Sequence, residues 1–179
     1  MTGMPRELLT ARLRLRAWRE TDGPAMAAIN RDPEVTRHLN RPVDEPAIAA
    51  FLDSRVSHWR RHGFGFYAVE SREPGLAGRF LGFVGVEHPT FLPAVAERRE
   101  LGWRLARGAW GRGLATEAAI AARDQAFATL SVTSLVSIIH PQNLRSRRVA
   151  RKLGMSIETA VYNPVLRRRV DLWAVSAPR

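Results

Sequence analysis

Alternating apolar and polar positions near the start of the chain predict a half-buried β-strand over residues 9–18. Leu13, Leu15 and Ala17 would face a core, and the arginines between them would lie on the other face. Thr21 and Asp22 then offer capping side chains for a short helix. Asp32-Pro33 should end that helix, because a residue that precedes proline disfavours helical geometry.

Apolar residues recur at steps of three and four between residues 45 and 62, which indicates an amphipathic helix. Short strands are predicted over residues 66–70 and 80–87, with glycines between them that suit a hairpin turn. A further strand is expected over residues 97–105. From Leu114 the apolar period changes from two to 3.6, and a stripe of alanines predicts a helix that can lie close to a sheet.

The last part of the chain predicts a strand, a helix and two more strands. Residues 135–139 are apolar, as in a buried strand. Asn143 is placed to cap a helix that runs to Leu153, and strands are expected over residues 155–162 and 167–175. This order of elements predicts a mixed α/β (α+β) domain.

Composition limits the class of protein. A chain of 179 residues with 45% hydrophobic residues suits one globular domain. No apolar run approaches the length of a membrane span, and the N-terminus lacks the apolar segment of a signal peptide, so we expect a cytoplasmic protein with no membrane partner. The absence of cysteine excludes disulfides, thiolate metal sites and cysteine nucleophiles.

The chain carries a formal charge of +11, and of its 28 basic residues only Lys152 is lysine. An arginine-rich surface attracts phosphate, nucleic acid or acidic proteins. From the charge alone we interpret it as a solvated basic face, and the composition of the genome also accounts for the excess of arginine. The GxSxG, GxxxxGK[ST] and GxGxxG patterns are absent, which argues against an α/β-hydrolase, a Walker-type nucleotide site and a dinucleotide site.

His58 and His62 lie four residues apart on the predicted helix and could share a metal ion. No HExxH pattern supplies further ligands, so we interpret them as surface histidines and expect no metal site. His140, at the end of a predicted strand, is a candidate for supporting a site residue. Gly111-Arg112-Gly113 before the helix at Leu114 is either a plain turn or a loop whose bare backbone approaches an anion.

Two segments, ELGWRLARGAWGRGLATEA and NLRSRRVARKLGM, resemble the signature segments of the GNAT acetyltransferases. They are most similar to the Rim-like branch, whose members acetylate N-terminal amines of ribosomal proteins. The resemblance extends to LLTARLRLRAW and VDLWAVS, and so covers most of the chain in the expected order. It implies one N-acetyltransferase domain over residues 1–179. Its sheet would be mostly antiparallel, with about seven strands and about four helices, splayed where the acyl-CoA binds.

The resemblance implies acetyl-CoA as the donor and a primary amine, most of all a protein N-terminal amine, as the acceptor. Gly113 and Ala115 match the last fixed positions of the family loop Q/R-x-x-G-x-G/A, and Trp110 replaces the first. Loop amides would bind the pyrophosphate, and the backbone of the preceding strand would pair with the pantetheine arm. Asn143 would hydrogen-bond to the cofactor, although a role as a plain helix cap also explains this residue. The cofactor-binding candidates are Arg104, Leu105, Trp110, Gly111, Arg112, Gly113, Leu114, Ala115, Thr116 and Asn143.

The expected reaction is direct attack of the amine on the thioester, with a backbone N–H of the 97–105 strand supporting the oxyanion. An N-terminal amine has a pKa of about 7.7–8.0, so modest help from a base is enough. Glu100 is the candidate base, because its strand would flank the thioester. The alternative is a surface glutamate paired with Arg98 or Arg104, and Glu97 is a weaker candidate.

Many family members carry a tyrosine near the leaving thiolate, where this chain has Ala150. Ser146 is the candidate to hold the sulfur or relay a proton, or it is simply a residue of the first helical turn. Three other functions stay open: acetylation of a small amine, nucleic-acid binding without catalysis, and an inactive member of the fold. Polycationic amines suit a basic chain poorly. Acceptor choice would rest on loops 30–45, 88–97 and 160–168, and the sequence does not distinguish a monomer from a homodimer.

Overall fold

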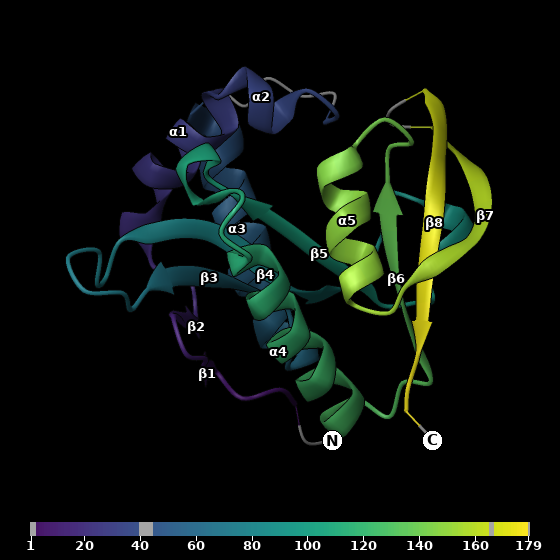
Figure 1. Cartoon of the computed structure of the whole chain (residues 1–179), viewed down its shortest axis with the longest axis horizontal. Helices are drawn as coiled ribbons and strands as arrows, with labels where there is room; N and C mark the ends of the chain where they lie inside the picture. Colours follow the sequence, from purple (N-terminus) through teal and green to yellow (C-terminus); the bar gives the residue numbers. More distant parts are fainter. Residues whose placement is uncertain (1–2, 40–44, 165–166, 179) are drawn as a thin grey trace.

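The computed structural model describes residues 3–39, 45–164 and 167–178. Within them the chain builds one eight-stranded sheet in the order β1-β2-β3-β4-β5-β6-β8-β7, flanked by five α-helices (Figure 1). Every neighbouring pair is antiparallel except β5 and β6. The predicted class, a mostly antiparallel mixed sheet with helices, is confirmed, with one strand and one helix more than the pattern predicted.

The strands are β1 (Glu7–Leu9), β2 (Leu13–Arg16), β3 (Phe66–Ser71), β4 (Phe80–Glu87), β5 (Glu100–Leu105), β6 (Ser134–Ile139), β7 (Ser156–Asn163) and β8 (Arg168–Ser176). The helices are α1 (Gly23–Arg31), α2 (Pro33–Thr36), α3 (Glu45–His62), α4 (Leu114–Thr129) and α5 (Leu144–Lys152). None of the described helices combines the length and apolar character that a bilayer span requires.

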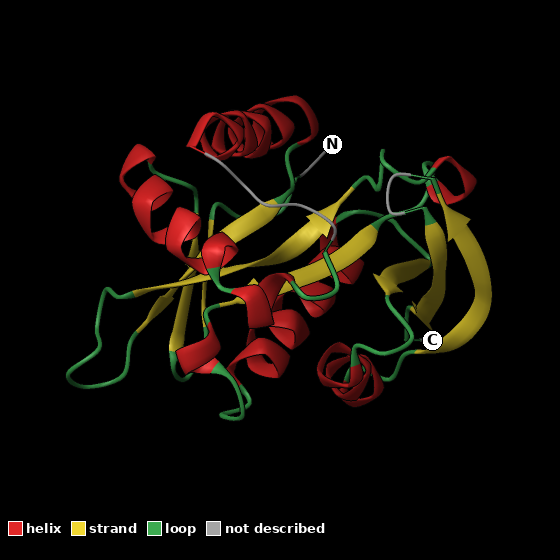
Figure 2. Cartoon of the chain, turned by 90° about the horizontal axis from the view of Figure 1, so that it is seen from above, coloured by secondary structure: helices red, strands yellow, loops and turns green. Residues whose placement is uncertain are grey.

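Helices cover both faces of the first half of the sheet (Figure 2). Four alanines of α4 are fully buried against one face, where they pack with residues such as Tyr67 and Leu101: Ala118, Ala119, Ala122 and Ala126. On the opposite face, Met26 of α1 and Ile48 of α3 pack with Phe83 of β4 and other apolar side chains. The small side chains let the backbone of α4 approach the sheet, as the sequence predicted, and this fixes the position of the loop that precedes it.

The predicted strand over residues 9–18 is instead a hairpin. Its first arm is β1, and the N–H of Thr10 bonds to the C=O of Leu13 at 2.9 Å where the chain turns into β2. Leu13 and Leu15 face the core and are fully buried, as predicted. Arg16 lies on the other face but is also buried, with 5% of its surface exposed.

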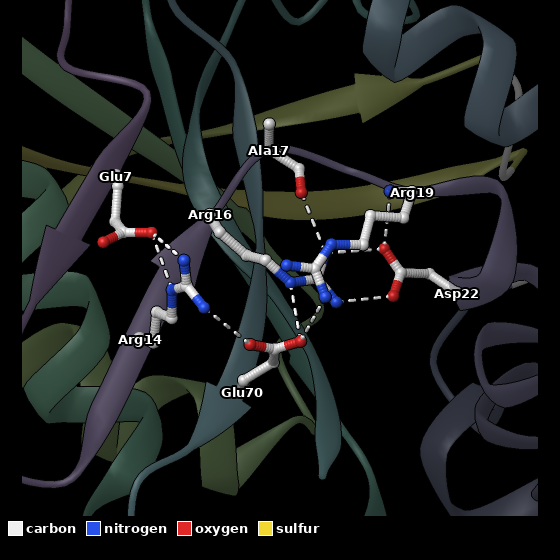
Figure 3. A network of polar contacts seen from close by, with 7 residues as sticks. All are labelled: Glu7, Arg14, Arg16, Ala17, Arg19, Asp22 and Glu70. Atoms are coloured by element: carbon white, nitrogen blue, oxygen red, sulfur yellow. Dashed lines mark hydrogen bonds and ion pairs between the residues drawn. The ribbon is translucent and has the colours of Figure 1, made fainter. Parts of the chain in front are cut away.

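A buried ion-pair network surrounds Arg16 (Figure 3). Its guanidinium donates to Glu70 of β3 at 2.7 Å and to both carboxylate oxygens of Asp22 at 2.8 and 2.7 Å. Asp22 occupies the N-cap position of α1 but makes no side-chain cap bond there; it accepts the N–H of Arg19 instead, at 2.8 Å. The expectation that Asp22 caps the short helix is therefore wrong, because a buried arginine claims its carboxylate.

Two other boundaries differ from the sequence pattern. The strand expected from residue 97 begins at Glu100. Pro33, expected only to end a helix, also starts α2, whose first turn is capped by Asp32 accepting the N–H of Glu34 at 2.8 Å. Both differences lie at the ends of elements, where local pattern carries least information.

Candidate active site

The loop between β5 and α4 presents a row of unpaired main-chain N–H groups. Gly111 and Gly113 have φ angles of +74° and +79°, in the left-handed region that favours glycine, and Gly113 is the N-cap of α4. In the described part of the chain, none of the amides from Gly111 to Thr116 has a protein acceptor; Glu117 is the first that does, bonding to Gly113 at 3.0 Å. With the positive end of the α4 dipole beside them, these amides suit a phosphate or pyrophosphate.

The N-terminal hairpin holds this loop in place. Arg12 donates to the C=O of Arg112 at 2.9 Å and pairs with Glu117 at 2.7 Å. The hydroxyl of Thr10 donates to Glu117 at 2.6 Å, and Arg112 pairs with Glu73 at 2.6 Å. Burial raises the pKa of Glu117, but the hydrogen bonds from Thr10 and Arg12 outweigh it and lower that pKa overall. The loop is thus anchored by its side chains and one carbonyl, while its amides stay free.

An open surface pocket of about 490 Å³ begins at the loop and runs along the first turns of α4. It is lined by Thr10, Gly113, Thr116, Glu117, Ile120, Ala121 and Lys152. The pocket gives a ligand bound at the loop amides space to extend over the surface of α4.

Strands β5 and β6 run parallel but separate almost at once (Figure 1). Among the described residues their ladder pairing is confined to Glu100 and Val136, and the Ser137 hydroxyl donates to the C=O of Leu101 at 2.5 Å. Further along, β5 continues to Leu105 with only β4 beside it. The sheet therefore opens on one side of β5, and this opening leads to the loop that precedes α4.

The direction of the backbone along this open edge follows from the ladder. The N–H of Ala106 bonds to β4 at Leu81, at 2.8 Å. Because main-chain groups alternate sides along a strand, the N–H and C=O of Arg104 also point toward β4. Those of Trp103 and Leu105 then point toward the opening, and these two residues provide the groups that an extended ligand could reach.

Trp110 closes the end of the opening nearest the loop. Its Nε1 donates to the C=O of Leu105 at 2.9 Å, and the guanidinium of Arg145 in α5 lies 4.5 Å from its ring centroid. Leu114 is fully buried beneath the loop, whereas Ala115 and Thr116 are partly exposed on the first turn of α4. Trp110 therefore connects β5, the loop and α5 at one point.

Glu100 lies where β5 and β6 part. Neither arginine that could have neutralised it does so, because Arg98 pairs with Glu158 at 2.6 Å and Arg104 donates to Asn30 at 2.6 Å. Burial of the carboxyl and the negative charge of Glu87 raise the pKa of Glu100 to about 8. A carboxyl with that pKa can take up a proton near neutral pH.

Sequence reasoning missed the partner of Glu100. Glu87 ends β4 directly opposite Glu100 in the ladder and is paired with Arg55 of α3. Burial raises the pKa of Glu87 to about 7, although Arg55 opposes that shift. The sequence did predict the two neighbouring strands that carry Glu87 and Glu100. It did not give the register of their pairing, which is what places the two carboxyls opposite each other.

Residues 12–156 match the family model described as an acetyltransferase (GNAT) domain. The chain belongs to the GNAT acetyltransferase family. A curated relative, the uncharacterized protein YkkB of Bacillus subtilis, is 29% identical over 153 residues, which are 83% of this chain and 84% of that protein. The family assignment confirms the prediction that the protein is an enzyme, an acetyltransferase.

Solved structures carry the same fold. The acetyltransferase from Agrobacterium tumefaciens is 31% identical, with a TM-score of 0.81 over 97% of this chain and 95% of that one. A RimL ribosomal L7/L12 alpha-N-protein acetyltransferase in complex with coenzyme A is 16% identical, with a TM-score of 0.73 over 97% of both chains. Rim-like proteins are thus among several kinds of GNAT acetyltransferase that match this chain.

In this GNAT acetyltransferase, helix α5 faces the opening between β5 and β6 and carries the remaining candidate site residues. Asn143 caps the helix, its side-chain oxygen accepting the N–H of Ser146 at 3.1 Å. Ser146 is partly exposed in the first turn, and Ala150 is fully buried in the core. The cap role of Asn143 is confirmed, and it leaves the two amide N–H groups free to donate elsewhere.

Contacts of the segment after α1 connect it to the ends of β6 and β8. His38, after α2, stacks on His140 at the end of β6 with ring centroids 4.9 Å apart. Arg168 of β8 donates to the C=O of His38 at 2.7 Å, and Arg145 lies 3.7 Å from Glu34. These contacts join residues 34–38 to α5, to the end of β6 and to β8. Of the loops expected to choose the acceptor, residues 40–44 and 165–166 lie outside the described residues.

The tryptophans do not form the exposed aromatic surface that a nucleic-acid site would need. Trp18, Trp59 and Trp173 are buried, and Trp103 and Trp110 are partly buried. The expectation that most of them fill core positions is confirmed.

Proposed function

We propose that this acetyltransferase acts over residues 1–179 as one domain that moves an acetyl group from acetyl-CoA to a primary amine, in the first place a protein N-terminal amine. One observation carries the proposal. The free amides of residues 111–116 stand beside the open edge of β5, so that a phosphate site and an extended-ligand site are continuous. A cofactor with a pyrophosphate and a long amide-bearing arm matches that arrangement.

The cofactor would use main-chain groups for most of its contacts. Amides from Gly111 to Thr116 would bind the pyrophosphate. The outward groups of Trp103 and the N–H of Leu105 would pair with the pantetheine amides in the manner of an added strand. The side-chain amide of Asn143 would donate from the facing helix. The coenzyme A complex of the similarly folded RimL protein supports this choice of cofactor.

Glu100 would act as the general base. The amine nitrogen attacks the thioester carbonyl carbon, the C–S bond breaks, and the proton lost by the amine passes to the Glu100 carboxylate directly or through water. A free N–H on the β5 edge supports the oxyanion. The leaving thiolate of coenzyme A would take up a proton from water, relayed by the Ser146 hydroxyl on α5.

The acceptor follows from matching of pKa values. An α-amino group titrates at about 7.7–8.0 and a lysine side chain at about 10.4. A base with a pKa of about 8 is matched to the first and poorly matched to the second. The formal charge of +11 also favours an acceptor whose following residues are acidic.

The test compares acceptors in one assay of acetyl transfer followed by mass spectrometry. The set contains an acidic peptide with a free N-terminus and no lysine, the same peptide with a blocked N-terminus and one lysine, a basic peptide, and spermidine. Acetylation fastest on the free N-terminus of the acidic peptide supports the proposal. Faster turnover of spermidine, or of the lysine peptide, would contradict it and favour a different amine.

A further inference from the structure

Three of the five histidines meet on the surface between α3 and β4. His58 and His62 lie one turn apart at the end of α3, and His88 directly follows β4. Their ring centroids are 4.5, 4.6 and 5.4 Å apart, and one ligand-capable nitrogen from each lies within 4.8 Å of the others. Local sequence showed only the pair on the helix; the fold supplies the third imidazole.

The cluster is built in the way a metal site is. His58 Nε2 and His88 Nδ1 are buried without a hydrogen-bond partner in the described part of the chain. Such orphaned ring nitrogens are costly unless something binds them. Phe64 packs against all three rings, with centroids 5.2 to 5.9 Å away, and the Arg99 guanidinium lies 5.4 Å from the Phe64 ring centroid. The nitrogens are thus shielded on one side by an aromatic ring.

The surroundings favour a metal held by directed bonds to nitrogen. The cluster offers three imidazole nitrogens, which are ligands that Zn²⁺ commonly takes. No carboxylate belongs to the cluster among the described residues, so a hard cation such as Mg²⁺ has no suitable ligands. The negative end of the α3 dipole partly offsets the arginine charge.

We propose that His58, His62 and His88 form a binding site for one Zn²⁺ ion or a similar borderline divalent metal, with a fourth position open to water. Ligands in a tetrahedral Zn²⁺ site lie about 3.3 Å apart, given Zn–N bonds of about 2.0–2.1 Å. The exposed His62 side chain can rotate to close the remaining distance.

The bound metal would fasten the end of α3 to the end of β4. Arg55, one turn before His58, already pairs with Glu87, the residue before His88. The metal would therefore hold together the same two elements that support the Glu87 and Glu100 pair. It would act as a structural fastener beside the site, and the proposal does not depend on the acceptor or on catalysis.

The test is a titration of the full chain, first stripped with a chelator, with Zn²⁺ in competition with a chromophoric chelator, and separately with Co²⁺ followed by visible absorption. We expect one ion per chain, Co²⁺ bands of the intensity that four-coordinate sites show, and a higher melting temperature with Zn²⁺. His62→Gln should lower the Zn²⁺ affinity at least about tenfold and remove the thermal shift. His88→Gln should do the same.

His38→Gln is the matched control, because His38 belongs to the other stacked histidine pair. It should bind Zn²⁺ as the unsubstituted protein does. Since His62 is exposed, its variant keeps the packing, and circular dichroism without metal confirms the fold. Absence of stoichiometric binding, or equal affinity of the His62 and His38 variants, would overturn the proposal.

Discussion

Replacing Glu100 with glutamine should remove the proposed base but keep a side chain of nearly the same size and shape. With a pKa of about 8, about one-tenth of Glu100 is ionised at pH 7 and about nine-tenths at pH 9. The rate that depends on this carboxylate should therefore rise about tenfold over those two units. General-base catalysis contributes about 10²–10⁴-fold, so Glu100→Gln should lower kcat/KM by that factor at pH 9.

The assay must separate Glu100 from the acceptor, because an N-terminal amine titrates in the same range. Measuring kcat/KM for both proteins from pH 6 to pH 9 and taking their ratio cancels the amine. The ratio of the unsubstituted protein to Glu100→Gln should rise about tenfold between pH 7 and pH 9. The ratio for Glu97→Gln, an exposed glutamate three residues earlier, should stay near one.

Stability gives a second reading of the same pKa. A carboxyl whose pKa is raised by folding holds its proton in the native state where the unfolded chain has lost it, here between about pH 5 and pH 8. The free energy of unfolding of the unsubstituted protein should therefore fall relative to Glu100→Gln as pH rises through that window. A rate ratio that is flat with pH, or within about threefold of one at pH 9, would refute the role of Glu100 as base.

Two further predictions concern the framework. Arg16→Ala removes the buried guanidinium that Asp22 and Glu70 share, and should lower the free energy of unfolding by about 3–5 kcal/mol. Arg14→Ala breaks the exposed pair with Glu7 and a longer contact of 3.9 Å to Glu70, and should cost less than about 1 kcal/mol. Urea denaturation measures both, and equal effects would contradict the network. Asn143→Ala should lose the helix cap, which lowers the free energy of unfolding by about 1 kcal/mol, and should also weaken acetyl-CoA binding. Asn143→Ser should keep the cap but still bind acetyl-CoA weakly, because serine lacks the side-chain amide. If calorimetry gives Asn143→Ser the same acetyl-CoA affinity as the unsubstituted protein, the amide contact is ruled out.

Local pattern was enough for elements whose faces differ clearly. The bounds of β4 and α3 agree with those predicted from period alone, and α4 begins at Leu114 as expected. These segments have a strong two- or 3.6-residue period and clear glycine or proline boundaries. The free amides at Gly111 and Gly113 were also predictable. Glycine directly before a helix favours a left-handed turn there, and the first N–H groups of a helix have no partner within it.

Contacts between distant segments were not predictable. Arg16 has the alternation of an exposed residue, and only the packing of the segment around Asp22 over β2 buries it. His88 joins His58 only because β4 ends beside the last turn of α3. The opening between β5 and β6 likewise depends on strand order, which one sequence does not contain. The residues that surround the site were therefore missed more often than those that form its main chain.

The proposed function requires the loop at Gly113 to be the phosphate site of an acetyl-CoA pocket. The decisive measurement is calorimetric titration with acetyl-CoA of three proteins: the unsubstituted chain, Gly113→Asp, and the control Gly108→Asp. A side chain at Gly108 meets open space and sits at an ordinary φ, whereas one at Gly113 requires a φ of +79°, in the left-handed region, at the N-cap of α4. We predict micromolar binding that Gly113→Asp abolishes and Gly108→Asp keeps. Undiminished binding by a folded Gly113→Asp, or none by the unsubstituted protein, would contradict the account.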